Sequence, residues 1–160
     1  MNWRYVLTSF DGRIGRQTFW IASLATAVVD LILMTVVGML LGAWPSHVVD
    51  LVFYYPQLAI SVKRGHDRNM PAWVVAVFLV LAIVFNVAQW LGWITNPTDQ
   101  NTYSSENIFS FVVTLVLGAI GIALLIELGF RKGTPGPNRY GPDPLAAIES
   151  AEKNSIASQR

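Results

Sequence analysis

The chain has 160 residues, of which 53% are hydrophobic and only 13% are charged, and its formal net charge is +1. This length accommodates one domain, and the charged fraction is about half that of an ordinary soluble domain. Because the sequence contains no cysteine, disulfides, thiolate metal sites, iron–sulfur clusters and cysteine nucleophiles are excluded.

The N-terminal part predicts a short helix followed by a first transmembrane span. Residues 17–41 form an apolar run that is too long for the core of a signal peptide and long enough to cross a bilayer. Before it, four large apolar residues recur at helical spacing, which predicts a helix lying in the membrane interface: Trp3, Val6, Leu7 and Phe10. Arg13 and Arg16 lie among glycines between the two, where they suit contact with phosphate as well as anchoring of the helix end.

Asp30 lies near the middle of the first predicted span, on a face that carries small and polar residues. A carboxylate within a membrane is costly and suggests function by default. The structural alternative is a protonated or hydrogen-bonded aspartate that packs against a neighbouring helix. A small oligomeric transporter that uses Asp30 as a proton or cation site is therefore one functional hypothesis.

The second apolar run decides the topology. Residues 48–62 would form about 22 Å of helix against an apolar core of about 30 Å, and Pro56 interrupts them. Ser46 is predicted to cap this helix, which places Asp50 in its first turn. If all four apolar runs cross the bilayer, all 11 Lys and Arg lie on one side, as the positive-inside bias prefers. The sequence thus predicts an all-α membrane protein with four transmembrane helices, at 17–41, 44–62, 72–94 and 107–130, and with both termini cytoplasmic.

The later spans carry three further polar residues. Asn86 and Gln89 share one face of the third span and are predicted to form hydrogen bonds to a neighbouring helix. Glu127 lies four residues before Arg131, so an ion pair within the helix is expected, with a proton relay as the alternative.

A charged loop, residues 62–73, is predicted between the second and third spans. It contains His66 and Asp67, the only neighbouring pair that suits acid–base chemistry. After the fourth span, the density of Gly and Pro in 131–144 excludes regular structure. The membrane domain is therefore predicted to cover 1–144, and residues 145–160 are predicted to be a disordered cytoplasmic tail.

Three blocks of this sequence together resemble the YhaH-like family of small bacterial inner-membrane proteins, a domain of unknown function numbered 805. They are Phe10-Asp11-Gly12-Arg13-Ile14-Gly15-Arg16 with Phe19-Trp20, then Lys63-Arg64-Gly65-His66-Asp67, then Gly133 with Asn138-Arg139-Tyr140-Gly141-Pro142-Asp143-Pro144. Lys63 and Gly65 depart from the Arg and Leu of the family pattern. The resemblance implies a multi-pass protein of the bacterial inner membrane and brings no established activity.

The leading functional hypothesis is a non-enzymatic membrane protein whose basic cytoplasmic face binds anionic lipid headgroups or a partner. A second copy of the chain or another membrane protein would be the partner, and no cofactor, metal or nucleic acid is expected. Seven cations are the predicted anion ligands: Arg13, Arg16, Lys63, Arg64, Arg68, Arg131 and Arg139. The enzymatic alternative is chemistry on a lipid-linked phosphate, with His66 as acid or base oriented by Asp67.

Overall fold

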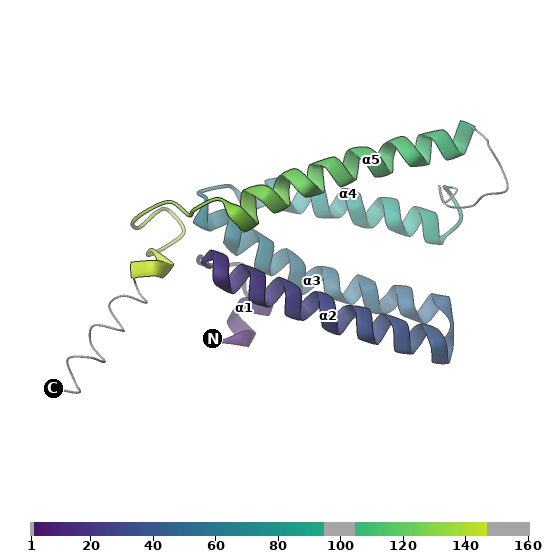
Figure 1. Cartoon of the computed structure of the whole chain (residues 1–160), viewed down its shortest axis with the longest axis horizontal. Coiled ribbons are helices and arrows are strands. Elements are labelled where there is room, and N and C mark those ends of the chain that lie inside the picture. Colours follow the sequence, from purple (N-terminus) through teal and green to yellow (C-terminus); the bar gives the residue numbers. More distant parts are fainter. Residues whose placement is uncertain (1, 95–104, 147–160) are drawn as a thin grey trace.

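The part of the chain that the structure describes is mainly helical. A computed structural model covers residues 2–94 and 105–146 (Figure 1). The elements follow in the order α1 (Trp3–Thr8), α2 (Arg16–Leu41), α3 (Ala43–Asp67), α4 (Ala72–Trp90), α5 (Ser105–Leu125) and a π-helical turn (Ile126–Phe130). Within these residues, the only strand-like feature is one bridge between Asn138 and Gly141. The all-α fold class predicted from the sequence is confirmed, whereas the predicted tail 145–160 lies almost wholly outside the described residues.

Three helices are long and apolar enough to cross a membrane. They are α2, α4 and the helix Ile108–Phe130, which correspond to the first, third and fourth predicted spans. The third ends earlier than predicted, because the chain turns after Trp90 and Gly92 adopts a φ of 72°. The second predicted span is α3, which is 25 residues long but more polar. Its crossing of the membrane stays a prediction.

The predicted loop 62–73 is shorter than expected, because α3 continues to Asp67. Residues 63–67, which were predicted to lie in the loop, form the last turn of this helix and are buried. The helix ends where Asn69 adopts a left-handed φ of 58°, and the N–H of Met70 returns to the carbonyl of Gly65 at 2.8 Å. The charges in this turn looked typical of a loop, but distant segments of the chain supply their partners.

α3 begins within one residue of the predicted start of the second span at residue 44, but its predicted cap at Ser46 is wrong. Gly42, with a φ of 92°, makes the turn from α2, and α3 begins at Ala43. Ser46 therefore lies inside the helix, where its hydroxyl donates to the carbonyl of Ala43 at 2.6 Å, and is not the capping residue. Asp50 consequently lies beyond the first turn, so the helix dipole no longer explains its presence.

The helices form two hairpins, α2–α3 and α4–α5 (Figure 1). The pair α2 and α3 has the most extensive contact, and α4 packs on α3. The start of α2, the end of α3, the start of α4 and the π-helical turn meet at one end of the molecule. The short helix α1 packs on α3 there through its buried Val6, so the predicted N-terminal helix exists, while its place in a membrane interface stays a prediction.

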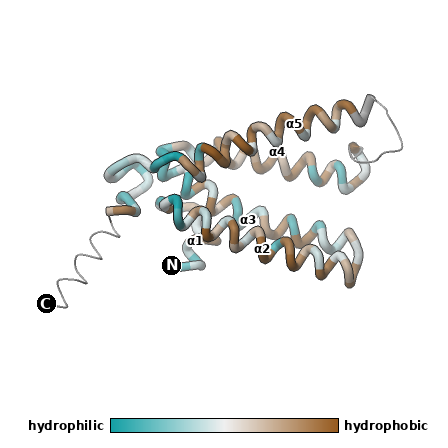
Figure 2. Tube along the Cα trace, viewed as in Figure 1, coloured by the Kyte–Doolittle hydropathy of each residue, from teal (hydrophilic) through white to brown (hydrophobic). Residues whose placement is uncertain are grey.

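Large apolar side chains cover the outside of the helices. Leu24, Leu31 and Leu115 are 66%, 63% and 57% exposed, respectively. Figure 2 shows hydrophobic residues along the lengths of the helices and hydrophilic ones gathered at the end where α2 begins. The buried apolar core, which includes Phe19 and Ile60, underlies that hydrophilic end. Such an inside-out distribution of apolar surface is what a lipid environment requires and what water disfavours.

Candidate functional site

Three distant segments fold together at the hydrophilic end into a structure that we call the polar cap. It consists of residues 11–16 before α2, residues 63–69 at the end of α3, and residues 131–143 after the π-helical turn. Backbone hydrogen bonds tie the segments together. The N–H of Ile14 donates to the carbonyl of Lys63 at 3.4 Å, and the N–H of Thr134 donates to the carbonyl of Asp67 at 2.8 Å. The three blocks that carry the family resemblance are thus in contact.

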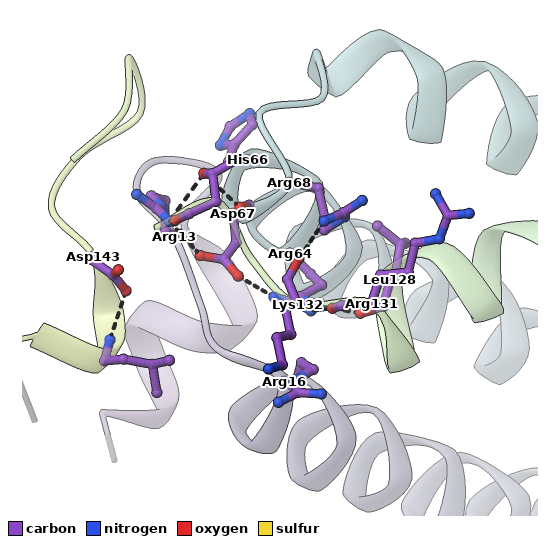
Figure 3. A network of polar contacts seen from close by, with 12 residues as sticks. Arg13, Arg16, Arg64, His66, Asp67, Arg68, Leu128, Arg131, Lys132 and Asp143 are labelled. Carbon is purple, nitrogen blue, oxygen red and sulfur yellow. Dashed lines mark hydrogen bonds and ion pairs between the residues drawn. The ribbon is translucent and has the colours of Figure 1, made fainter. Parts of the chain in front are cut away.

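Asp67 is the centre of the polar cap (Figure 3). Its Oδ1 accepts hydrogen bonds from Nε and Nη2 of Arg13 at 3.0 and 2.8 Å, and its Oδ2 accepts one from Nη1 of Arg64. The side chains of Arg13, Arg64 and Asp67 are 1%, 0% and 5% exposed. One carboxylate therefore lies between two buried guanidinium groups, an arrangement that is stable only while every partner is present.

The remaining donors of the two arginines bind the third segment. Arg13 donates to the carbonyls of Thr134 and Gly136 at 2.7 and 2.8 Å. Arg64 donates to the carbonyls of Leu128 and Arg131, each at 2.5 Å. These bonds hold residues 128–136 over the end of α3. Because such charge-assisted bonds are among the stronger ones in proteins, the segment is fixed without regular structure.

His66 and Asp67 do not form the acid–base pair that the enzymatic alternative requires. The ring of His66 points away from the carboxylate of Asp67, and its Nδ1 lies 3.1 Å from the carbonyl of Gly12, to which it donates (Figure 3). Its other contact is a stack on Tyr140, with ring centroids 3.8 Å apart. Burial lowers the pKa of His66. The imidazole therefore serves as a structural contact between two segments of the cap.

Lys63 also has a structural role. Its side chain is fully buried, and its Nζ donates to the carbonyls of Tyr5 and, at 2.7 Å, Val6 at the end of α1. The ammonium lies 4.6 Å from the centre of the Tyr5 ring, within the range of a cation–π interaction. Burial lowers the pKa of Lys63 to about 8. This residue thus fastens α1 to α3.

Glu127 has the ion pair that the sequence predicted and a second one besides. Its Oε2 lies 2.9 Å from Nη1 of Arg131, four residues later. Its Oε1 lies 2.7 Å from Nη2 of Arg68, which comes from the turn after α3. The predicted pair with Arg131 is confirmed, and the pair with Arg68 joins the α3–α4 turn to the π-helical turn.

Several cations of the cap are left at the surface. Of the predicted anion ligands, Arg13, Lys63 and Arg64 are buried with protein partners, whereas Arg16, Arg131 and Arg139 are exposed. Lys132, the neighbour of Arg131 in the third segment, is also exposed and extends toward Arg16 (Figure 3). Anion binding stays a prediction, and these exposed residues are the ones that an anion from outside the protein can reach.

Aromatic rings border these exposed cations. Trp20 donates its indole N–H to the carbonyl of Gly129 at 3.0 Å and packs edge to face on Phe130, with centroids 5.4 Å apart. Arg16 donates to the carbonyl of Phe130 at 3.3 Å. Trp at the boundary between apolar and polar regions is typical of membrane proteins, so the boundary passes close to Arg16.

The polar residues within the predicted spans have three different surroundings. Gln89 of α4 donates to the hydroxyl of Ser110 of α5 at 3.3 Å, as predicted. Asn86 instead donates to the carbonyl of Ala82 in its own helix at 2.8 Å, and its predicted bond to another helix is not found among the described residues. Asp30 lines a cavity between α2 and α3 together with Asp50, a residue that the sequence analysis explained as part of a helix start.

Comparison with known proteins gives a family and several relatives. The family model described as "Protein of unknown function (DUF805)" matches residues 7–142. The uncharacterized protein YiiR of Escherichia coli K12 is 33% identical over 158 residues, covering 93% of this chain and 94% of that protein. The inner membrane proteins YhaH and YhaI of the same strain are 22% and 25% identical, and the matches cover 84% of this chain and 86% and 85% of those proteins. No solved structure matches.

Proposed function

This chain belongs to the DUF805 family, and from that premise we propose that it is a non-enzymatic, multi-pass inner-membrane protein whose polar cap faces the cytoplasm and binds anionic lipid headgroups. The membrane setting is supported by the relatives named as inner membrane proteins and by the three apolar helices. The number of crossings, the orientation and the lipid site are the proposed parts.

The proposed topology has four crossings, with α3 as the second. α3 returns alongside α2 over almost the same length, 25 residues against 26, and the two form the most extensive helix pair. Every Lys and Arg among the described residues lies at the end that contains the polar cap, and residues 17–62 contain none. The positive-inside bias then assigns the polar cap, and both ends of the chain, to the cytoplasm.

The single observation that carries lipid binding is the position of the exposed cations. Arg16 donates to the carbonyl of Phe130, whose ring packs on Trp20, and Lys132 extends toward Arg16 (Figure 3), at the level where apolar helix gives way to the polar cap. A lipid phosphate occupies the same level of a bilayer. Each cation near an anionic leaflet contributes about 1 kcal/mol, so removal of two should weaken binding by about 2 kcal/mol, or roughly 30-fold.

The buried arginines cannot make this contribution without breaking the fold. Arg13 and Arg64 use their donors on Asp67 and on backbone carbonyls. A lipid phosphate would have to displace those bonds and would gain little over them. The proposed lipid site therefore consists of exposed residues: Arg16, Arg131, Lys132 and Arg139.

The test compares lipid retention by variants of the purified full chain in native mass spectrometry. The double variant Arg16→Gln/Lys132→Gln should lose most bound cardiolipin and phosphatidylglycerol. The matched control, Arg16→Lys/Lys132→Arg, keeps both charges and should retain them. Equal retention of anionic lipid by the Gln variant and the unaltered chain would refute the proposed site.

A further inference from the structure

The cavity between α2 and α3 lies outside the polar cap and has no part in the function proposed above. Its volume is about 180 Å³. Five of its lining residues carry polar side chains: Thr26 and Asp30 from α2, and Asp50, Tyr54 and Gln57 from α3. They lie within the length of these helices rather than at an end. Ala27 and Phe53 complete the lining.

In the described part of the chain, the two carboxylates of the cavity have no counter-charge. Residues 17–62, which include the whole lining, contain no Lys or Arg. Neither Asp30 nor Asp50 has an ion-pair partner in the described part of the chain, and Oδ1 of Asp30 is buried without a hydrogen-bond donor. His47, the one basic side chain nearby, stacks on Trp90 with centroids 4.4 Å apart. Carboxylates at membrane depth are costly unless a positive charge or a proton balances them.

The lining indicates which kind of positive charge fits. The described residues contain no group of three or more His, Asp or Glu that could hold a metal ion, and divalent metals need such oxygen-rich sets. The rings of Phe53 and Tyr54 border the cavity, and aromatic faces attract organic cations that are weakly hydrated. The cavity volume of about 180 Å³ is roughly the volume that six water molecules occupy in the liquid. It is larger than a bare ion requires and smaller than a drug-sized ligand needs.

We propose that this cavity is a binding site for a small organic ammonium ion, held by Asp30 and Asp50. The carboxylates balance its charge, and the oxygens of Thr26, Tyr54 and Gln57 are available to accept its N–H groups. Phe53 supplies an aromatic wall for the carbon atoms of the ligand. The site is independent of lipid binding at the polar cap, because the two share no residue.

The experiment measures equilibrium binding of radiolabelled methylammonium to the full chain in lipid nanodiscs. The unaltered chain should show one saturable site. Asp30→Asn and Asp50→Asn should each weaken binding at least about tenfold, since each removes a charge that faces the ligand. The matched control is Asp11→Asn, which removes an exposed carboxylate of the polar cap and should leave binding unchanged.

One further variant and one competition measurement complete the test. Phe53→Leu leaves both carboxylates in place and should weaken binding about threefold to tenfold by removing the aromatic wall, which guards against misfolding of the Asn variants. Unlabelled ethylammonium chloride, which keeps three N–H groups, should displace the label, whereas sodium chloride at equal concentration should not. The proposal is overturned if no saturable site is found, if the Asn variants bind like the unaltered chain, or if sodium displaces the label equally well.

Discussion

Removal of the charge of Asp67 should release the third segment of the polar cap. In Asp67→Asn the side chain keeps its shape, but Arg13 and Arg64, which are 1% and 0% exposed, lose their shared carboxylate. Breaking a buried ion pair by removing one partner costs about 3–5 kcal/mol. We expect a value near 3 kcal/mol, because both guanidinium groups keep their bonds to backbone carbonyls.

A loss of about 3 kcal/mol raises the population of the opened cap by roughly a hundredfold. Hydrogen exchange of the full chain in nanodiscs measures this at the amide of Thr134, whose N–H donates to the carbonyl of Asp67 at 2.8 Å. Exchange there should accelerate by about that factor, while amides in the middle of α2 should be unaffected. The matched control, Asp11→Asn, removes an exposed carboxylate and should change exchange by less than about threefold. Exchange of Thr134 in Asp67→Asn within threefold of the unaltered chain would refute the central role of this ion pair.

Two further predictions concern the same cap. Gly133→Ala should destabilise the cap by about 1–3 kcal/mol, because a Cβ there would lie only 2.6 Å from Cγ of Asp67, which two arginines hold in place. The control is Gly118→Ala, at a glycine with open space around it. Equal hydrogen exchange at Thr134 in both variants would count against the contact. Acid should also destabilise the cap, because burial lowers the pKa of His66 below its ordinary value. The stabilisation from neutral His66 is complete above about pH 6.5. It is lost as the pH falls through the lower pKa of the folded state. His66→Gln should flatten this part of the pH dependence of Thr134 exchange, and an unchanged pH profile would show that another group is responsible.

The apolar helices could be predicted from the sequence because their signal is local. α2 begins at Arg16 and ends at Leu41, which agrees with the predicted span 17–41 within one residue. Length and composition decide such a span whatever its neighbours are. The ion pair of Glu127 with Arg131 was predictable for the same reason, since it needs only a helix and a spacing of four residues.

The end of α3 could not be predicted, because its partners are far away in sequence. Arg64 donates to the carbonyl of Leu128, 64 residues later, and Lys63 donates to that of Val6, 57 residues earlier. Without those partners, a run of charges is expected to be solvated, so a loop was the reasonable prediction. The predicted topology places the three segments of the cap at the same end of the helices, but nothing in their local patterns indicated which side chains of one segment bind the others.

The cavity was missed for a different reason. Asp50 was explained by a predicted cap at Ser46, which would place it in the first turn of the helix, and that explanation removed it from the candidate residues. The helix in fact begins at Ala43, after the turn at Gly42. The wrong cap assignment at Ser46 therefore concealed a second carboxylate beside Asp30.

The proposed topology is tested most directly by labelling at the two ends of α3. The chain has no cysteine, so single cysteines can be introduced at Ala43 and Asn69, which are both exposed and flank this helix. With four crossings, a membrane-impermeant maleimide should label Ala43→Cys in intact cells with a permeable outer membrane, and Asn69→Cys only in inverted vesicles. Labelling of Asn69→Cys from outside the cell, or of both positions from the same side, would contradict a polar cap on the cytoplasmic face.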